Sequence, residues 1–245
     1  LLAGIGRERA RAETFGKPLQ VYGHGYLSSL VFSPDGSKLA LTSNRIVQII
    51  DAQTGQTIKF FVGLVFVAFS PDGRQLLANS SKAAKLWDLA SGSLIRTFSD
   101  PTEAVYATSF SADGSKVLTI SGHKSAKLWD AATGSLIRTF SDHTHAITSA
   151  RFLDGSMIMT EESVIFGNTI RIWDAATGAH LRTFSFSGSS NSPIISPDGS
   201  KILFTVDLIH TAKLYDVATG TTNDSFTSLV GAVTSVAFSP DGSKI

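Results

Sequence analysis

Cysteine is absent from the sequence. Disulfide bridges and thiolate metal sites are therefore excluded, while reducing and oxidising compartments both tolerate such a chain. Charge of one sign is lacking too: the formal net charge is +1, which gives no broad field that would attract nucleic acid or an anionic membrane. We therefore expect neither nucleic acid nor a membrane as a partner, and we expect a cytoplasmic protein.

Long hydrophobic runs are also missing. The longest, from Phe60 to Phe69, has about half of the roughly 20 residues that a membrane-spanning helix needs. Between residues 26 and 245, no apolar stripe persists at helical spacing for a dozen residues, which predicts an all-β chain. Near the start, basic residues follow the apolar ones, the reverse of a signal peptide, and no initiator methionine is present. We expect a fragment in which residues 1–15 are a linker or a remnant of a preceding segment.

Catalytic motifs are missing as well. No two glycines lie four or five positions apart, so a nucleophile elbow and a Walker loop are both excluded. No His-Glu-x-x-His occurs. His143 and His145 could face one way in an extended loop, but only Asp142 lies nearby, so we interpret them as exposed loop histidines rather than metal ligands. We expect no catalytic residue, no cofactor and no metal.

What the sequence does contain is a repeated Asp-Gly turn. The steps between its glycines are 37, 41, 41, 44 and 43 residues, and the glycines are Gly36, Gly73, Gly114, Gly155, Gly199 and Gly242. Four of these turns read Ser-Pro-Asp-Gly. Proline supplies the φ of a type I turn, aspartate bonds its own backbone, and glycine accepts the positive φ that returns the chain. Each motif therefore predicts a strand, a tight turn and a second strand.

An aromatic residue followed by aspartate ends a third strand in most repeats. Each pair closes an apolar-polar alternation of period two, and the pairs are Trp87-Asp88, Trp129-Asp130, Trp173-Asp174 and Tyr215-Asp216, with Ile50-Asp51 in the first repeat. A Thr-Gly or Ser-Gly turn comes next, followed by a last strand such as Ser135 to Phe140. Each repeat thus contains four short strands.

A period near 41 with four strands and a Trp-Asp pair resembles the WD-repeat β-propeller family, and the resemblance covers residues 16–245. It implies an all-β β-propeller of four-stranded antiparallel blades. Five complete blades are expected at about residues 30–61, 65–98, 106–140, 147–184 and 193–226. The near-identical repeats are similar to those of bacterial WD-repeat proteins, so we expect a bacterial source.

A sixth blade is expected to be split or incomplete. The resemblance implies that residues 233–245 supply its inner strands and residues 16–22 its outermost strand. No Trp-Asp precedes Gly16, however, and the second strand has only begun where the sequence ends. A ring closed by the two termini and a parent protein with seven or more blades both remain open, and we favour the second.

The family ties each blade with a buried network of a histidine before the first strand, a hydroxyl on the second, an aspartate in the following turn and the tryptophan. Here the aspartate positions hold Asn44, Ser81, His123, Gly167 and Ile209. His24 precedes a blade with Ile50 in place of tryptophan, and His143 is the next match. We therefore expect blades held mainly by apolar burial. The basic residues of the outermost strands are predicted to protect exposed edges and aid solubility, and they are Lys59, Arg96, Arg138 and Arg182.

The innermost strands line the channel of such a ring, and Arg151 is their only charged residue. The resemblance implies a non-catalytic scaffold that mediates protein-protein interaction through the loop face, either as a monomeric propeller or as part of a larger chain. The alternative is a propeller enzyme or small-ligand sensor whose site lies on blades missing from this chain.

Candidate partner contacts lie in the loops between the second and third strands. The connection from Thr160 to Thr169 is expected to be a long loop with an apolar triplet, Val164, Ile165 and Phe166, next to two glutamates. The same loop of the fifth blade offers Leu208 and His210, and that of the third offers His123 and Lys124; His143 and His145 complete the set. Two alternatives stay open: the triplet could fill space between blades, and the third-blade pair could be solvated.

Overall fold

The computed structural model describes residues 27–80, 82–99, 104–122, 124–164, 167–187, 193–206, 211–227, 233 and 235–245. Within these ranges every regular element is a strand, and the strands form five sheets of four antiparallel strands each. The predicted all-β fold with five four-stranded blades is confirmed.

The strands of each sheet are termed a, b, c and d in chain order. The first sheet consists of β1 (Leu27–Phe32), β2 (Lys38–Ser43), β3 (Ile46–Asp51) and β4 (Thr57–Val62). The second consists of β5 (Val65–Phe69), β6 (Gln75–Ser80), β7 (Ala83–Asp88) and β8 (Leu94–Ser99). The third consists of β9 (Val105–Phe110), β10 (Lys116–Ser121), β11 (Ser125–Asp130) and β12 (Leu136–Phe140). The fourth consists of β13 (Ile147–Phe152), β14 (Met157–Val164), β15 (Gly167–Asp174) and β16 (His180–Ser187). The fifth consists of β17 (Ile194–Ile195), β18 (Lys201–Val206), β19 (Thr211–Asp216) and β20 (Thr222–Thr227).

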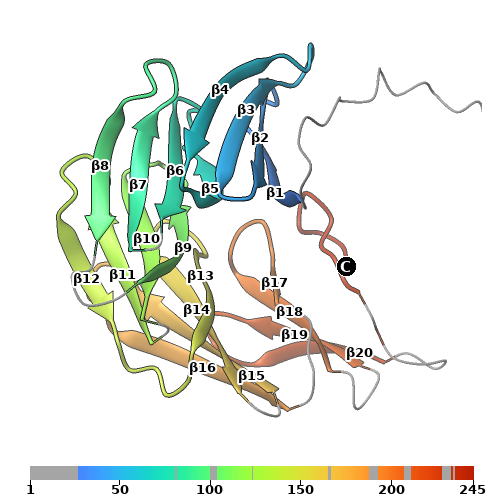
Figure 1. Cartoon of the computed structure of the whole chain (residues 1–245). Coiled ribbons are helices and arrows are strands. Elements are labelled where there is room, and N and C mark those ends of the chain that lie inside the picture. The colour runs from blue at the N-terminus through green and yellow to red at the C-terminus, as the bar shows by residue number, and fades with distance from the viewer. Residues whose placement is uncertain are drawn as a thin grey trace, which may run out of the picture.

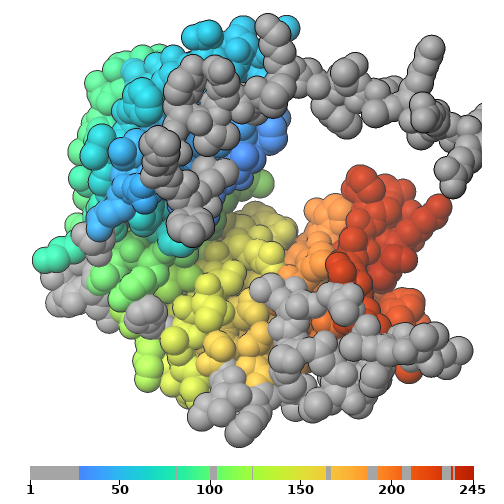
Figure 2. Space-filling model, turned by 45° about the vertical axis from the view of Figure 1, so that its right-hand side comes forward, coloured from blue at the N-terminus to red at the C-terminus, as the bar shows by residue number. Residues whose placement is uncertain are grey.

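The five sheets follow one another around an arc, with the a strands innermost and the d strands outermost (Figure 1). The first sheet and the C-terminal segment lie at the two ends of this arc, and open space separates them in the space-filling view (Figure 2). Each sheet is thus one blade, packed face to face against its neighbours.

Every a–b turn is built from local hydrogen bonds. In the first blade the Ser33 hydroxyl donates to Asp35 Oδ1 at 2.5 Å, and the Gly36 amide donates to the Ser33 carbonyl at 2.8 Å. Gly36 has a φ of +70°, which a residue with a Cβ adopts only with strain. The turn of the fourth blade differs because Leu153 replaces the serine: its amide bonds the Met157 carbonyl, so the turn is one residue shorter, and Gly155 is not left-handed.

The aspartate of each aromatic-aspartate pair stabilises the c–d turn that follows it. In the third blade, Asp130 Oδ1 accepts from the amide and the hydroxyl of Thr133 at 2.7 and 2.8 Å. The same arrangement recurs at Asp51, Asp88, Asp174 and Asp216. The repeated carboxylate is therefore a turn residue.

The basic residues of the d strands have a role in addition to the one predicted. Each reaches across to the next blade and donates to a carbonyl of its c–d turn: Lys59 to Ala90, Arg96 to Ala132, Arg138 to Ala176, and Arg182 to Ala218, at 3.0, 2.8, 2.5 and 2.7 Å. Protection of exposed edges and solubility stay a prediction for these residues, and the structure adds contacts with the neighbouring blade, which lies within reach of the long side chains. They connect consecutive blades.

The apolar core lies between blades. At the first junction, Val47 and Ile49 of one blade pack with Leu76 and Trp87 of the next. A strand-d phenylalanine meets the strand-c aromatic of the following blade at four junctions, with ring centroids 5.4 to 6.0 Å apart; the pairs are Phe61–Trp87, Phe98–Trp129, Phe140–Trp173 and Phe184–Tyr215. Each blade therefore depends on its neighbour to bury its core.

Beyond the fifth blade, Val233, Val236 and Phe238 pack against buried residues of β18 and β19. The next a–b turn is formed, since the Ser239 amide donates to the Lys244 carbonyl at 2.9 Å. Among the described residues of 233–245 there is no strand. The predicted linker, residues 1–15, and the predicted outer strand of the split blade, residues 16–22, lie outside the described residues.

We predict that Gly178→Ala destabilises the fold by about 1 to 3 kcal/mol, because the residue has a φ of +78° and a Cβ there would lie 2.7 Å from Arg138 Cδ. Gly155→Ala is the matched control, since its Cβ would meet no atom within 4 Å and its φ is not left-handed. Urea unfolding measures both. Equal stability of the two variants would contradict the strain.

Acid should also weaken the a–b turns. Hydrogen bonds from the Ser196 hydroxyl and from Ser200 lower the pKa of Asp198 from 3.8 to about 2. A carboxyl whose pKa is lower in the folded chain stabilises it above pH 3.8, and this contribution is lost as the pH falls towards 2. We expect Asp198→Asn to reduce the pH dependence of the unfolding free energy in this window, and Asp224→Asn in the middle of β20 to serve as control. An unchanged slope in Asp198→Asn would refute the prediction.

Candidate functional site

The two ends of each blade form two faces of the molecule, the turn face and the loop face. The turn face carries the a–b and c–d turns, and the loop face carries the b–c and d–a connections. Of the candidate contacts, Ile165, Phe166, Leu208, His210 and His123 lie outside the described residues. Lys124 is exposed immediately before β11, and Val164 is the last residue of β14, paired with Gly167.

The expected long loop from Thr160 to Thr169 is wrong. β14 continues to Val164 and β15 begins at Gly167, and the two pair along their whole length. Glu161 and Glu162 are therefore strand residues, 3% and 0% exposed. Both glutamates can lie in a buried strand because each has a hydrogen-bond partner there: Asn168 for Glu161 and Arg171 for Glu162.

His143 is buried, with 6% exposure, so its interpretation as an exposed loop histidine is also wrong. Its Nε2 lies 2.8 Å from Thr160 Oγ1, which accepts a hydrogen bond of 2.9 Å from Trp173 Nε1. Burial lowers the pKa of His143, which favours the neutral ring that the threonine hydroxyl can donate to. His143 belongs to a structural network at the junction of the third and fourth blades.

Glu162 fixes the loop that carries this histidine. Its Oε2 accepts from the amides of Thr144 and His145 at 3.1 and 3.0 Å, and its Oε1 accepts from Arg171 Nε at 2.5 Å. Burial by itself would raise the pKa of Glu162, but the hydrogen bonds from Arg171 and His145 outweigh it and hold the pKa below its usual value. His145 remains 53% exposed, 3.9 Å from this carboxylate.

One position of strand b decides how polar each junction is. Thr119 accepts from Trp129 Nε1 at 2.9 Å, as Thr160 does from Trp173. The same register position holds Ala78 in the second blade, and Trp87 Nε1 has no hydrogen-bond partner there among the described residues. In the fifth blade it holds Phe204, whose ring stacks on Tyr215 at 5.0 Å. The tryptophan–threonine hydrogen bond is thus present in two blades, and among the described residues only the fourth blade adds a histidine to it, whereas the second and fifth blades have an apolar residue in place of the threonine.

A charged pair lies between the fourth and fifth blades. Arg151 donates to the Pro193 carbonyl at 2.5 Å, and Glu161 Oε1 accepts from Asn168 at 3.1 Å. Burial raises the pKa of Glu161 and lowers that of Arg151, while the charge of each opposes the shift of the other. Arg151, predicted to line the channel, therefore contributes to a blade junction.

The loop face presents a group of exposed side chains, of which the sequence pattern indicated only Lys124. A β-bulge near the start of strand a turns one residue outward in each of four blades: Ser28, Phe66, Tyr106 and Thr148, all exposed. The residue immediately before strand c is basic and exposed in the first three blades, as Arg45, Lys82 and Lys124. Only the register of the neighbouring strand reveals a bulge, so alternation along one strand could not find these residues.

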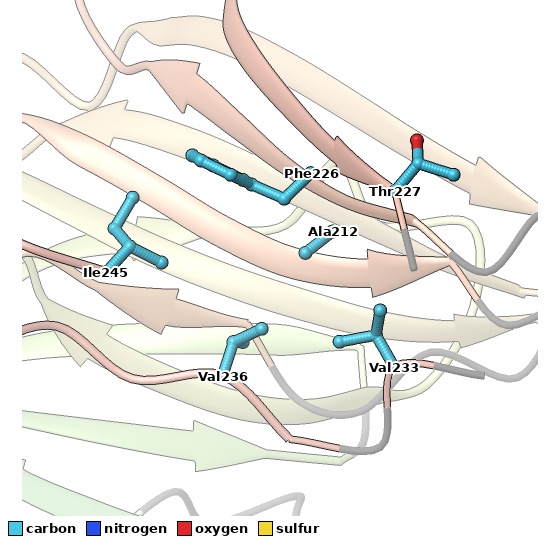
Figure 3. Close-up of a pocket in the computed structure, with 6 residues that line it drawn as sticks. All are labelled: Ala212, Phe226, Thr227, Val233, Val236 and Ile245. Atoms are coloured by element: carbon cyan, nitrogen blue, oxygen red, sulfur yellow. The ribbon is translucent and has the colours of Figure 1, made fainter. Parts of the chain in front are cut away.

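An apolar groove of about 280 Å³ lies at the end of the fifth blade. Its walls come from β19, β20 and the C-terminal segment, and its lining is Ala212, Phe226, Thr227, Val233, Val236 and Ile245 (Figure 3). Phe226 pairs in register with Ala212, as Phe98 does with Ala84, but it is 42% exposed whereas Phe98 is fully buried. The groove is the place that the aromatic of a following blade fills at the other junctions, and no titratable group lines it.

The described residues include no group of three or more His, Asp or Glu side chains placed to hold a metal ion. A helix long and apolar enough to cross a membrane is likewise not found in the described part of the chain.

The repeated blades and the aromatic that closes strand c define a propeller-type array. The family model described as "WD domain, G-beta repeat" matches residues 16–51, 57–88 and 92–130. Three segments within the first 130 residues of the chain are thus similar to WD repeats. Among solved structures, a chain of "Crystal Structure of Mitotic Checkpoint Complex" is similar with a TM-score of 0.71 and 23% identity, over 89% of this chain and 70% of that one. No curated protein matches this chain.

The hydrogen bonds of Thr160 and Thr119 lead to a prediction about stability. We predict that Thr160→Val destabilises the protein about twice as much as Thr119→Val, because it leaves both Trp173 and His143 without the hydroxyl, whereas the second change affects Trp129 alone. Each buried group left unpaired costs about 1 to 3 kcal/mol. Valine keeps the shape of threonine, so chemical denaturation reports the hydrogen bonds; equal losses would show that His143 gains nothing from Thr160.

Proposed function

We propose that this chain is a non-catalytic WD-repeat scaffold that binds other proteins through its loop face. The observation that carries the proposal is the contrast between the two faces. On the turn face, aspartates bond their own turns, and d-strand basic side chains bond the next blade. On the loop face, Arg45, Lys82, Lys124, Phe66 and His145 are exposed on a rigid frame.

The similar propeller supports this proposal by analogy. It was solved within an assembly described as a mitotic checkpoint complex, so a protein of this fold takes part in a multi-protein complex. The predicted contacts Ile165, Phe166, Leu208, His210 and His123 lie outside the described residues, and the sequence repeat, which assigns them to b–c loops, makes them part of the proposal.

The test compares single charge reversals on the two faces. Lys124→Glu alters the loop face and Arg74→Glu alters an exposed residue of the turn face. We expect Lys124→Glu to reduce recovery of native partners by about fivefold or more, and Arg74→Glu to leave recovery unchanged, as measured by quantitative mass spectrometry of purified complexes. Phe166→Ser tests the apolar triplet in the same assay.

Thermal unfolding of each variant serves as the control for folding. Loss of partners only in Arg74→Glu would move the interface to the turn face and overturn the proposal. Unchanged recovery in Phe166→Ser, with unchanged stability, would remove the triplet from the interface.

A further inference from the structure

Phe66 occupies an unusual position on the loop face. It is the bulge residue of β5, since Val65 pairs with Asn79 and Val67 with Ala78, and it is 58% exposed. Its φ is +39°, in the left-handed region that a bulky side chain rarely adopts. The chain therefore holds a large aromatic side chain in solvent at the cost of backbone strain, which is a mark of functional positions.

The equivalent residues of other blades have a local task that Phe66 cannot perform. The Ser28 hydroxyl donates to the Thr42 carbonyl at 2.9 Å, and the Thr148 hydroxyl donates to the Glu161 carbonyl at 3.2 Å. Phenylalanine has no such donor. In the third blade the bulge residue is again aromatic, Tyr106, which is 41% exposed. Two adjacent blades thus place exposed rings where their neighbours place small hydroxyls.

Exposed basic residues lie in the loops beside the segments that lead into Phe66 and Tyr106. The Arg45 carbonyl accepts from the Gly63 and Leu64 amides at 2.7 and 3.1 Å, which ties this residue to the segment leading into Phe66. Lys82 ends the b–c loop of the same blade as Phe66. In the third blade the Gly122 amide donates to the Ala104 carbonyl at 3.1 Å, which joins the loop of Lys124 to the segment leading into Tyr106. The aromatic-basic patch is defined as Arg45, Phe66, Lys82, Tyr106 and Lys124.

We propose that the aromatic-basic patch binds a peptide segment of a partner that carries an apolar anchor flanked by carboxylates. This inference rests on the proposed function and names the chemistry of the partner. The exposed rings suit an apolar side chain, and three basic residues on successive blades suit acidic groups spaced along an extended peptide. A peptide is favoured over a nucleic-acid strand because the chain has a net charge of only +1 and the patch offers a single basic residue in each of three blades.

The experiment selects ligands from a displayed library of random short peptides on the immobilised whole chain. We expect the selected peptides to be enriched in Asp and Glu next to an aromatic or aliphatic residue. Phe66→Asn removes the ring and suits the left-handed backbone, so it should bind the selected peptide at least about tenfold more weakly without loss of stability. Phe60→Thr is the matched control: Phe60 is also 58% exposed, but it lies on the outer strand β4, where three other blades carry threonine.

Charge is tested with Lys82→Glu and with a selected peptide whose acidic residues are replaced by amides. Both should weaken binding about tenfold, and added salt should do the same to a lesser degree. Selection of basic or uncharged peptides, equal loss in Phe66→Asn and Phe60→Thr, or displacement of the peptide by single-stranded oligothymidylate at equal concentration would overturn the inference. If native partners still depend on Lys124 while acidic peptides fail to bind, only the identity of the ligand is wrong; if acidic peptides bind but no native partner depends on the loop face, the proposed scaffold function fails instead.

Discussion

The contact between the strand-d phenylalanine of one blade and the strand-c aromatic of the next is the interaction on which the rest of this structure depends. A four-stranded blade is too thin to bury its own side chains, so both of its faces need a neighbour. Burial of such a ring contributes about 1.5 to 3 kcal/mol, and the aromatic pairing adds about 0.5 to 1.5 kcal/mol. The pairs from Phe61–Trp87 to Phe184–Tyr215 therefore join each blade to the next, and Phe226, which has no such aromatic beside it among the described residues, is 42% exposed.

Much of the fold could be predicted from the sequence because its signals are local. A Ser-Pro-Asp-Gly turn is made by residues within six positions of one another, as the bonds of Ser33, Asp35 and Lys38 show, so the sequence pattern locates the turn. The burial of His143 could not be predicted in this way, because it depends on Thr160 and Trp173 of the following blade. The long β14 was missed for the same reason, since two glutamates in a row indicate a loop unless Arg171 and Asn168 are known to face them.

The residues of the candidate site likewise fall into those that local sequence signals predict and those that depend on contacts with another strand. Lys124 was predicted because its loop could be placed from the repeat alone, whereas no sequence signal points to Phe66 and Tyr106. A bulge changes which side of the strand a residue faces, and it arises from the register with a second strand. The two faces differ in the same way. Repeated local hydrogen bonds fix the turn face, whereas the b–c and d–a loops differ from blade to blade, so their residues can change without altering the strands that carry them.

The different fillings of one strand-b position have a consequence for assembly. Blades two to four share much of their sequence, and a chain of similar units risks docking a unit against the wrong neighbour while it folds. At the junction of the fourth and fifth blades, Phe204 packs against Phe186 of the preceding blade, and Arg151 of that blade donates to the Pro193 carbonyl. A different neighbour after the fourth blade would leave the Arg151 guanidinium without that carbonyl and Phe186 without the Phe204 ring. The fourth and fifth blades are therefore not interchangeable with the others, and their irregular residues favour one order of stacking at this junction.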